Sequence, residues 1–200
     1  MESNDLTVVI VTYRSENKIF SCLNSIPGEI NVIVVENSNN KEFKKLIESK
    51  YSNVKCILAN ENLGYARGNN LGLKQVKTKY ALVLNPDARL EKNCVNNFLN
   101  TAKKFQNFWL IGPANDQTDF NVNSEEFEVD NLKGFAIFFN IQKFNNSFFD
   151  ENFFLYFEEI DLCKKVRMKK GNIILSKNIK INHEGSGSVD KNNINEFEKN

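Results

Sequence analysis

The sequence lacks an excess of charge of either sign and lacks any hydrophobic run long enough to span a membrane. Its 26 basic and 25 acidic residues leave a net charge of +1, which argues against a nucleic-acid binder that relies on bulk positive charge. A membrane-spanning helix needs about 20 consecutive apolar residues, and the polar segment from Met1 to Asp5 is unlike a signal peptide. We therefore expect a cytoplasmic protein with one well-buried core.

Histidine and closely spaced cysteines are also scarce. Four cysteines are scattered along the chain without CxxC spacing: Cys22, Cys56, Cys94 and Cys163. Each falls in an apolar segment, where a free cysteine behaves as a small hydrophobic residue. We therefore expect neither a zinc site built on cysteines nor a disulfide framework.

Strands and helices are predicted to alternate through the first half of the chain. Runs rich in β-branched residues predict buried strands at 6–12, 32–35 and 54–58, each followed by a polar loop. Apolar residues at three- and four-residue spacing predict helices at 16–26 and around 43–47. This order predicts an α/β fold, with a single mixed and mostly parallel sheet flanked by helices.

The polar residues that follow the predicted strands should converge, because the carboxyl ends of parallel strands share one edge of the sheet. Ligands bind at that edge in open α/β sheets. The residues concerned are Thr12, Arg14, Glu36, Asn37, Asn60, Asn62, Arg67, Asn85 and Asp87.

The chain is organised around residues 80–88, a buried strand that ends at Asn85-Pro86-Asp87. Proline cannot donate a hydrogen bond to a strand ladder, so the carboxylate of Asp87 is delivered at the carboxyl end of a strand. There it could meet a metal-bound phosphate ligand. The alternative is that the tripeptide is only a turn, since all three residue types favour turns.

The segment of residues 64–72 is spaced by glycines but is neither a Walker loop nor a GxGxxG motif directly after a strand. One interpretation is an anion site, in which Gly68 admits a close backbone, Asn70 offers an amide and Arg67 adds charge-assisted hydrogen bonds. The alternative is a helix N-terminus whose glycines allow tight packing. The residues alone favour neither interpretation.

The second half is predicted to contain a helix over 90–105, a strand over 109–112, a loop or edge element over 114–130 and a buried strand over 132–140. Further strands are predicted at 172–176 and before His183, the only histidine. His183 precedes a glycine-rich loop and could complete a metal site with Asp87, although a lone histidine is more often a surface or packing residue.

Aromatic residues lead directly into acids between residues 148 and 161. The helix that begins at Glu158 carries acids in its first turn and bases later, which matches the helix dipole, and Gly171 is the expected stop. The dipole alone explains these acids well. The alternative is that one carboxylate beside aromatic walls is a general base, with a pKa tuned by partial burial.

The order of these motifs resembles the inverting family 2 glycosyltransferases of the GT-A fold, and within them the rhamnosyltransferase-like branch. The matching segments are Val9-Ile-Val-Thr-Tyr13, Val34-Val-Glu-Asn-Ser38, residues 60–72, Leu84-Asn-Pro-Asp-Ala88, residues 154–163 and His183-Glu-Gly-Ser186. The resemblance implies a glycosyltransferase domain over residues 1–189, followed by a polar tail over 190–200.

The resemblance also implies roles for individual residues. Mg²⁺ or Mn²⁺ would be held by Asp87 and His183. The acidic pair near the acceptor falls on Glu158 and Glu159, of which the second is usually the base, and Asp161 is a further candidate. The implied donor-binding residues are Thr12, Tyr13, Arg14, Glu36, Asn62, Gly64, Arg67, Asn70 and Asn85.

The implied reaction explains these residue types. A divalent ion neutralises the diphosphate leaving group, while a carboxylate takes the proton of the attacking acceptor hydroxyl, and one displacement inverts the anomeric centre. The implied partners are a UDP, dTDP or GDP sugar and a saccharide or lipid-linked acceptor in cell-surface polysaccharide synthesis, without nucleic acid. Association with the inner membrane, at its cytoplasmic face, or with a partner subunit is compatible with this role.

Two other functions are weighed. One is a non-catalytic or degenerate subunit that binds a nucleotide sugar. The other is a sugar-1-phosphate nucleotidyltransferase, which would carry a glycine-rich first loop with lysine, and residues 12–15 lack that loop.

Overall fold

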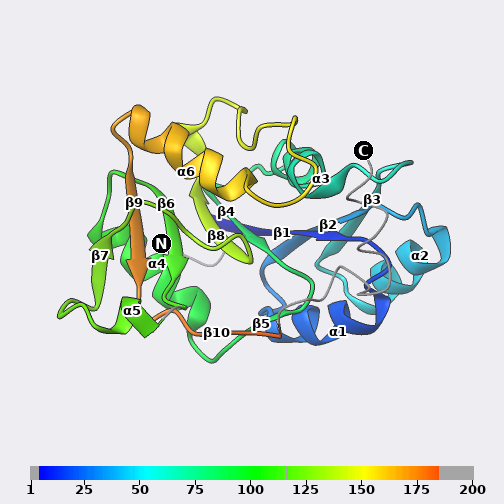
Figure 1. The fold of residues 1–200 in the computed structure, drawn as a ribbon. Helices are drawn as coiled ribbons and strands as arrows, with labels where there is room; N and C mark the ends of the chain where they lie inside the picture. The colour runs from blue at the N-terminus through cyan, green and yellow to red at the C-terminus, as the bar shows by residue number, and fades with distance from the viewer. Residues whose placement is uncertain (1–4, 116, 185–200) are drawn as a thin grey trace.

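The computed structural model describes residues 5–115 and 117–184. An eight-stranded sheet in the order β3-β2-β1-β4-β8-β6-β9-β7 divides the molecule into two helical layers (Figure 1). Its strands are β1 (Leu6–Thr12), β2 (Asn31–Glu36), β3 (Val54–Leu58), β4 (Tyr80–Leu84), β6 (Phe108–Pro113), β7 (Glu126–Glu128), β8 (Ala136–Asn140) and β9 (Asn172–Ser176).

The sheet is mixed and mostly parallel, which confirms the predicted fold class. The pairs β3–β2, β2–β1, β1–β4 and β6–β9 are parallel, and β8 runs antiparallel to both β4 and β6. The strand β1 shows why the sequence forms such a strand. Val8 and Ile10 enter one core and Val9 enters the other, so the continuous apolar run covers both faces.

Helices cover both faces. The helices α1 (Glu16–Ser25), α2 (Lys41–Lys50) and α4 (Cys94–Lys104) pack on one face through buried residues such as Ile19, Ile47 and Phe98. The helices α3 (Gly64–Leu73) and α6 (Glu158–Met168) pack on the other through Leu73 and Cys163. Two short helices, α5 (Gln117–Phe120) and η2 (Ile141–Lys143), are also described.

A separate ribbon lies beside the main sheet. Its strands, β5 (Ala88–Leu90) and β10 (Ile181–His183), pair antiparallel with His183 opposite Ala88. The prediction of a helix over 90–105 is therefore wrong at its start. Leu90 pairs with Ile181, and Asn93 has a φ of 65°, which α-helical backbone does not allow.

Two other expectations are tested by the fold. The predicted edge element over 114–130 is confirmed by β7, which pairs with β9 at the outer edge of the sheet. The helix α6 ends just before Gly171 as predicted, and the Gly171 N–H donates to the Val166 carbonyl at 2.9 Å, but Lys170 and not Gly171 takes the left-handed conformation (φ 56°). Gly171 instead leaves room for Trp109, since a Cβ there would lie 2.7 Å from the indole.

Some expectations concern residues outside the described ranges. These include the glycine-rich loop after His183, the domain boundary at residue 189 and the tail over 190–200. Within the described ranges the four cysteines are buried free thiols, and none of the helices combines the length and hydropathy that a membrane span requires.

Candidate active site

The strand order reverses between β1 and β4, and in open α/β sheets the carboxyl ends at such a reversal bound a ligand crevice. Thr12 ends β1, and its carbonyl accepts a hydrogen bond of 2.8 Å from the Asn37 backbone N–H. Thr12 Oγ1 and Asn37 Oδ1 are buried without a hydrogen-bond partner. Buried polar atoms of this kind are rare, so this edge holds unused hydrogen-bonding capacity.

Glu36 organises the loop that follows β2. Its carboxylate accepts hydrogen bonds from the backbone N–H groups of Ser38 (2.9 Å) and Asn40 (2.6 Å) and from the Ser38 hydroxyl. The side chain is fully buried, which requires such compensation for a carboxylate. The structure thus gives Glu36 a role in shaping the edge, and its contact with a nucleoside stays a prediction.

Two glycines of α3, Gly68 and Gly72, allow the helix to pack tightly on the sheet, as one of the two interpretations of this segment predicts. A Cβ at Gly72 would lie 2.5 Å from Val9 Cγ1, and one at Gly68 would lie 2.9 Å from Val11 Cγ1, so both glycines let α3 sit against β1. Gly64 has a φ of 70° and begins the helix, where its N–H donates to Asn62 Oδ1 at 3.1 Å. Asn62 therefore forms the turn into α3.

Asn70, Arg67 and Arg14 each have a different partner within the chain. Asn70 is buried and connects α3 to the segment over 149–151. Its side-chain NH₂ donates to the Phe149 carbonyl and to the Glu151 carboxylate, and its side-chain oxygen accepts the Phe149 N–H. Arg67 is exposed and pairs with Glu61 at 3.2 Å. In the loop after β1, the Arg14 guanidinium lies 5.2 Å from the centroid of the adjacent Tyr13 ring.

Asp87 lies in a turn and also places its carboxylate at the carboxyl end of β4, so the two interpretations of Asn85-Pro86-Asp87 are compatible. The Ala88 N–H donates to the Asn85 carbonyl at 3.1 Å, which closes the turn, and Asp87 is only 5% exposed. Its Oδ1 lies 3.3 Å from His183 Nε2. Burial acts to raise the pKa of Asp87, but the imidazole of His183 and the charge of Lys18 outweigh burial and hold that pKa below its usual value.

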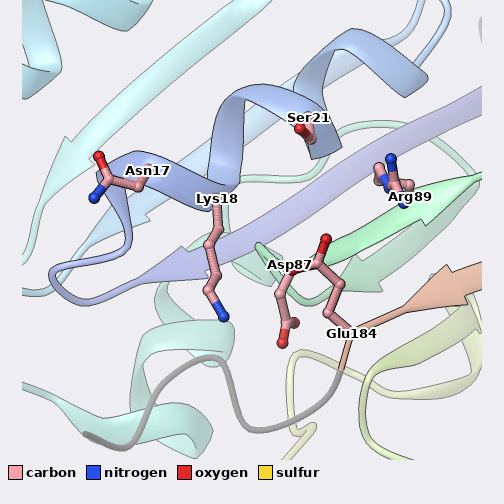
Figure 2. A pocket seen from close by; sticks show the side chains of 6 residues that line it. All are labelled: Asn17, Lys18, Ser21, Asp87, Arg89 and Glu184. Atoms are coloured by element: carbon pink, nitrogen blue, oxygen red, sulfur yellow. The ribbon is translucent and has the colours of Figure 1, made fainter.

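Asp87 also lines a small pocket (Figure 2). Lys18 and Ser21 line this pocket from α1, Arg89 lines it from β5, and Glu184 lies beside Asp87 after β10, while Asn17 also belongs to the lining. The sequence analysis missed Lys18, Ser21 and Arg89. Lys18 and Ser21 are three residues apart on a helix, which places them on one face, whereas Arg89 lies just before the predicted helix over 90–105 and belongs to β5, a strand that the sequence analysis did not predict.

Asp87 and His183 suit a divalent ion. Apart from the His183 imidazole, 3.3 Å away, the buried Asp87 Oδ1 atom has no hydrogen-bond partner among the described residues, and carboxylate oxygen with imidazole nitrogen is a ligand set compatible with Mn²⁺. Among the described residues no group of three or more acidic, histidine or cysteine side chains is arranged to hold a metal. Two protein ligands fit an ion that takes phosphate oxygens from a substrate, as Mg²⁺ commonly does.

The acidic residues at the start of α6 occupy three different environments. Glu158 is 4% exposed, and burial, with a contribution from the Glu159 charge, raises its pKa to about 7. Asp161 pairs with Lys165 at 2.8 Å. Glu159 is half-buried, and Gly134 lies beside it, with 3.7 Å between the Glu159 Cβ and a Cβ built on Gly134.

The Gly134-Phe135 segment joins the acidic residues to the Asp87 site. The Gly134 carbonyl accepts a hydrogen bond from the Tyr65 hydroxyl. Burial is the main cause that raises the pKa of this phenol, and the nearby charges of Glu158 and Glu159 raise it further. The Phe135 carbonyl accepts the Asn85 N–H at 2.8 Å. The Phe135 ring stacks on His183, with 4.4 Å between centroids. Two consecutive residues thus contact both halves of the site.

Comparison with curated proteins identifies a relative that is longer than this chain. The low-salt glycan biosynthesis hexosyltransferase Agl10 of Haloferax volcanii is 26% identical over 199 residues, an alignment that covers 85% of this chain and 64% of that protein. The chain therefore spans slightly less than two thirds of the length of this relative.

Solved structures share the fold at low sequence identity. TarS 1–349 of S. aureus in complex with UDP-GlcNAc superposes with a TM-score of 0.71 at 20% identity, covering 86% of this chain and 56% of that one. Mannosyltransferase PcManGT from Pyrobaculum calidifontis in complex with GDP-Man and Mn²⁺ gives 0.73 at 13% identity, with 88% and 55% covered. The sequence model described as Glycosyl transferase family 2 matches residues 7–163. The chain therefore belongs to glycosyl transferase family 2.

Proposed function

We propose that this chain transfers a hexose or deoxyhexose such as rhamnose from a nucleoside diphosphate donor to a saccharide or lipid-linked acceptor, with inversion, in cell-surface polysaccharide synthesis. The observation that carries the proposal is the arrangement around Gly134-Phe135: Phe135 stacks on His183, the neighbour of Asp87, and Gly134 lies beside Glu159. This arrangement supports one site for donor activation and proton acceptance.

The donor side consists of the Asp87 pocket and the carboxyl ends of β1 and β2. Asp87 and His183 would hold Mg²⁺ or Mn²⁺, which neutralises the diphosphate when bound. Lys18 and Arg89 line the same pocket and would add positive charge for the phosphates. The unpartnered Thr12 and Asn37 oxygens are available to the nucleoside of a UDP, dTDP or GDP sugar.

The environments of the three acids favour Glu159 as the base. Glu158 is buried and Asp161 is occupied by Lys165, whereas Glu159 is partly accessible. The acceptor oxygen attacks the anomeric carbon, its proton passes to the Glu159 carboxylate, and the bond from the anomeric carbon to the diphosphate oxygen breaks. Attack from the face opposite the leaving group inverts the anomeric configuration.

Isothermal titration with UDP, dTDP and GDP, each with and without Mn²⁺, tests the donor side. We expect one nucleotide to bind in a metal-dependent manner. Release of that nucleoside diphosphate from its sugar donor in the presence of a saccharide panel tests transfer. Glu159→Gln should keep nucleotide affinity within about twofold and lower transfer by about 10²-fold or more, and Asp161→Asn is the matched control.

The outcomes separate the alternatives. Nucleotide binding without turnover on any acceptor would favour a non-catalytic donor-binding subunit. Full transfer by Glu159→Gln would assign the base elsewhere, and absence of metal-dependent binding with all three nucleotides would refute the proposal.

A further inference from the structure

Two aromatic side chains are exposed directly before the acidic pair of α6. Tyr156 is 60% exposed and Phe157 is 65% exposed, and Ile160 follows one turn later at 44%. Most phenylalanines of the described chain are instead packed in the two cores. A cluster of exposed large apolar side chains beside a reactive group indicates a binding surface.

The backbone of this segment is strained. Tyr156 and Phe157 both have a φ of 69°, a left-handed conformation that is unfavourable for bulky residues. Such conformations cost on the order of 1–3 kcal/mol each and persist where the surrounding structure fixes them. The strain presents both rings to solvent and buries neither, so it brings no packing in return.

Several anchors fix the segment in this conformation. The Phe154 carbonyl accepts the Tyr65 N–H at 2.7 Å, and Asp150 pairs with Lys165 of α6 at 2.8 Å. On the α3 side, the Asn70 amide binds the Phe149 backbone. Figure 1 shows the yellow segment running from beside α3 to the start of α6. The rings are therefore presented from a fastened loop.

The chemistry around the rings matches a sugar. One face of a pyranose ring carries C–H bonds, which pack against the negative face of an aromatic ring, and its hydroxyls need hydrogen-bond acceptors. Of the carboxylates near the segment in sequence, Glu151 pairs with Lys74 and Asp161 pairs with Lys165. Glu159 is partly accessible and can accept hydrogen bonds from the hydroxyls of a neutral sugar.

We infer that Tyr156 and Phe157 form a stacking platform for a pyranose ring of the acceptor saccharide, which sets the acceptor hydroxyl beside Glu159. The inference rests on the proposed function and names the acceptor class of the same site. It makes the two aromatic residues determinants of acceptor specificity, distinct from the residues that bind the donor.

Saturation-transfer difference NMR with a panel of methyl pyranosides tests the platform on the full chain, with irradiation of aromatic protons. We expect at least one pyranoside to bind, with the largest transfer to protons on one face of the ring. Tyr156→Ala and Phe157→Ala should each weaken binding by about tenfold, and Phe120→Ala, which removes an exposed phenylalanine elsewhere, should leave it unchanged. Metal-dependent nucleotide affinity should be the same in all variants.

Phe157→Gly separates binding from folding. Glycine adopts a φ of 69° without strain, so this variant should keep or raise the thermal midpoint while it weakens pyranoside binding. A purely structural role predicts the opposite, a lower midpoint with unchanged binding.

Three outcomes would overturn the platform. In the first, the wild type binds no pyranoside. In the second, the aromatic variants bind pyranosides as well as the wild type does. In the third, the aromatic substitutions abolish binding to phosphatidylglycerol vesicles and leave binding to sugars unchanged. If nucleotide binds normally in any of these cases, the proposed function survives. If pyranosides bind through Tyr156 but no nucleotide binds, the platform stands and the proposed donor reaction fails.

Discussion

Asp87 Oδ1 and His183 Nε2 lie 3.3 Å apart because the ribbon of β5 and β10 places His183 opposite Ala88. The contact therefore depends on a strand pair outside the main sheet. Asp87 is buried, and its pKa is held below the usual value against the effect of burial. The carboxylate is thus ionised at neutral pH, which is the state that binds a divalent ion.

Asp87→Asn tests this ionised state directly, since the substitution keeps the size of the side chain and removes its charge. We expect Mn²⁺-dependent affinity for the bound nucleotide to fall by tenfold or more, about 1.4 kcal/mol, in isothermal titration. Asp130→Asn is the control, because Asp130 is exposed and pairs with Arg167. Equal affinities in wild type and Asp87→Asn would remove Asp87 from the metal site.

Phe135 should orient the imidazole of His183, since the two rings are stacked at 9°. Phe135→Leu should weaken Mn²⁺ binding. Electron paramagnetic resonance of the free ion, recorded in the presence of nucleotide, measures this binding. Phe43→Leu is the control, because Phe43 is equally buried but lies in α2. Each substitution should cost about 1–2 kcal/mol of stability. If both change Mn²⁺ binding equally, Phe135 has no special role.

Glu158 should make stability depend on pH. Burial raises its pKa from 4.5 to about 7 in the folded state, so the folded protein keeps a proton that the unfolded chain releases. The free energy of unfolding should therefore fall as pH rises from about 4.5 to about 7, by up to about 3 kcal/mol, and stay level above. Urea denaturation across this range measures the effect.

Glu158→Gln should abolish that loss, because glutamine does not titrate. Glu29→Gln, at an exposed position, is the matched control for removal of a carboxyl group. Two results would contradict the assignment of this pH dependence to Glu158. One is a wild-type free energy of unfolding that stays level between pH 4.5 and 7, and the other is an equally steep fall in Glu158→Gln.

Gly72 should be required for the packing of α3 on the sheet. A Cβ there would lie 2.5 Å from Val9 Cγ1 and 3.3 Å from Val35 Cγ2, so Gly72→Ala should destabilise the protein by about 1–3 kcal/mol through overpacking. Gly28→Ala is the control, because a Cβ at Gly28 meets nothing within 4 Å. Thermal denaturation of both variants measures the difference, and equal midpoints would count against the close approach.

Local patterns in the sequence determined most elements of the fold. The apolar run of β1 and the turn at Asn85-Pro86-Asp87 were readable because burial periodicity and turn chemistry act over a few neighbouring residues. The helix over 90–105 was mispredicted at its start because Leu90 pairs with Ile181, and nothing near Leu90 in the sequence encodes that partner.

The sequence by itself determined the α/β class, the strand that delivers Asp87, and the motif order that resembles family 2 glycosyltransferases. Only the tertiary structure decided that His183 lies against Phe135, that Lys18 shares the Asp87 pocket, and that Asn70 is occupied by the 149–151 segment. The physical reason is that such contacts join residues far apart in the chain, and their geometry follows from how the strands pair and the helices pack.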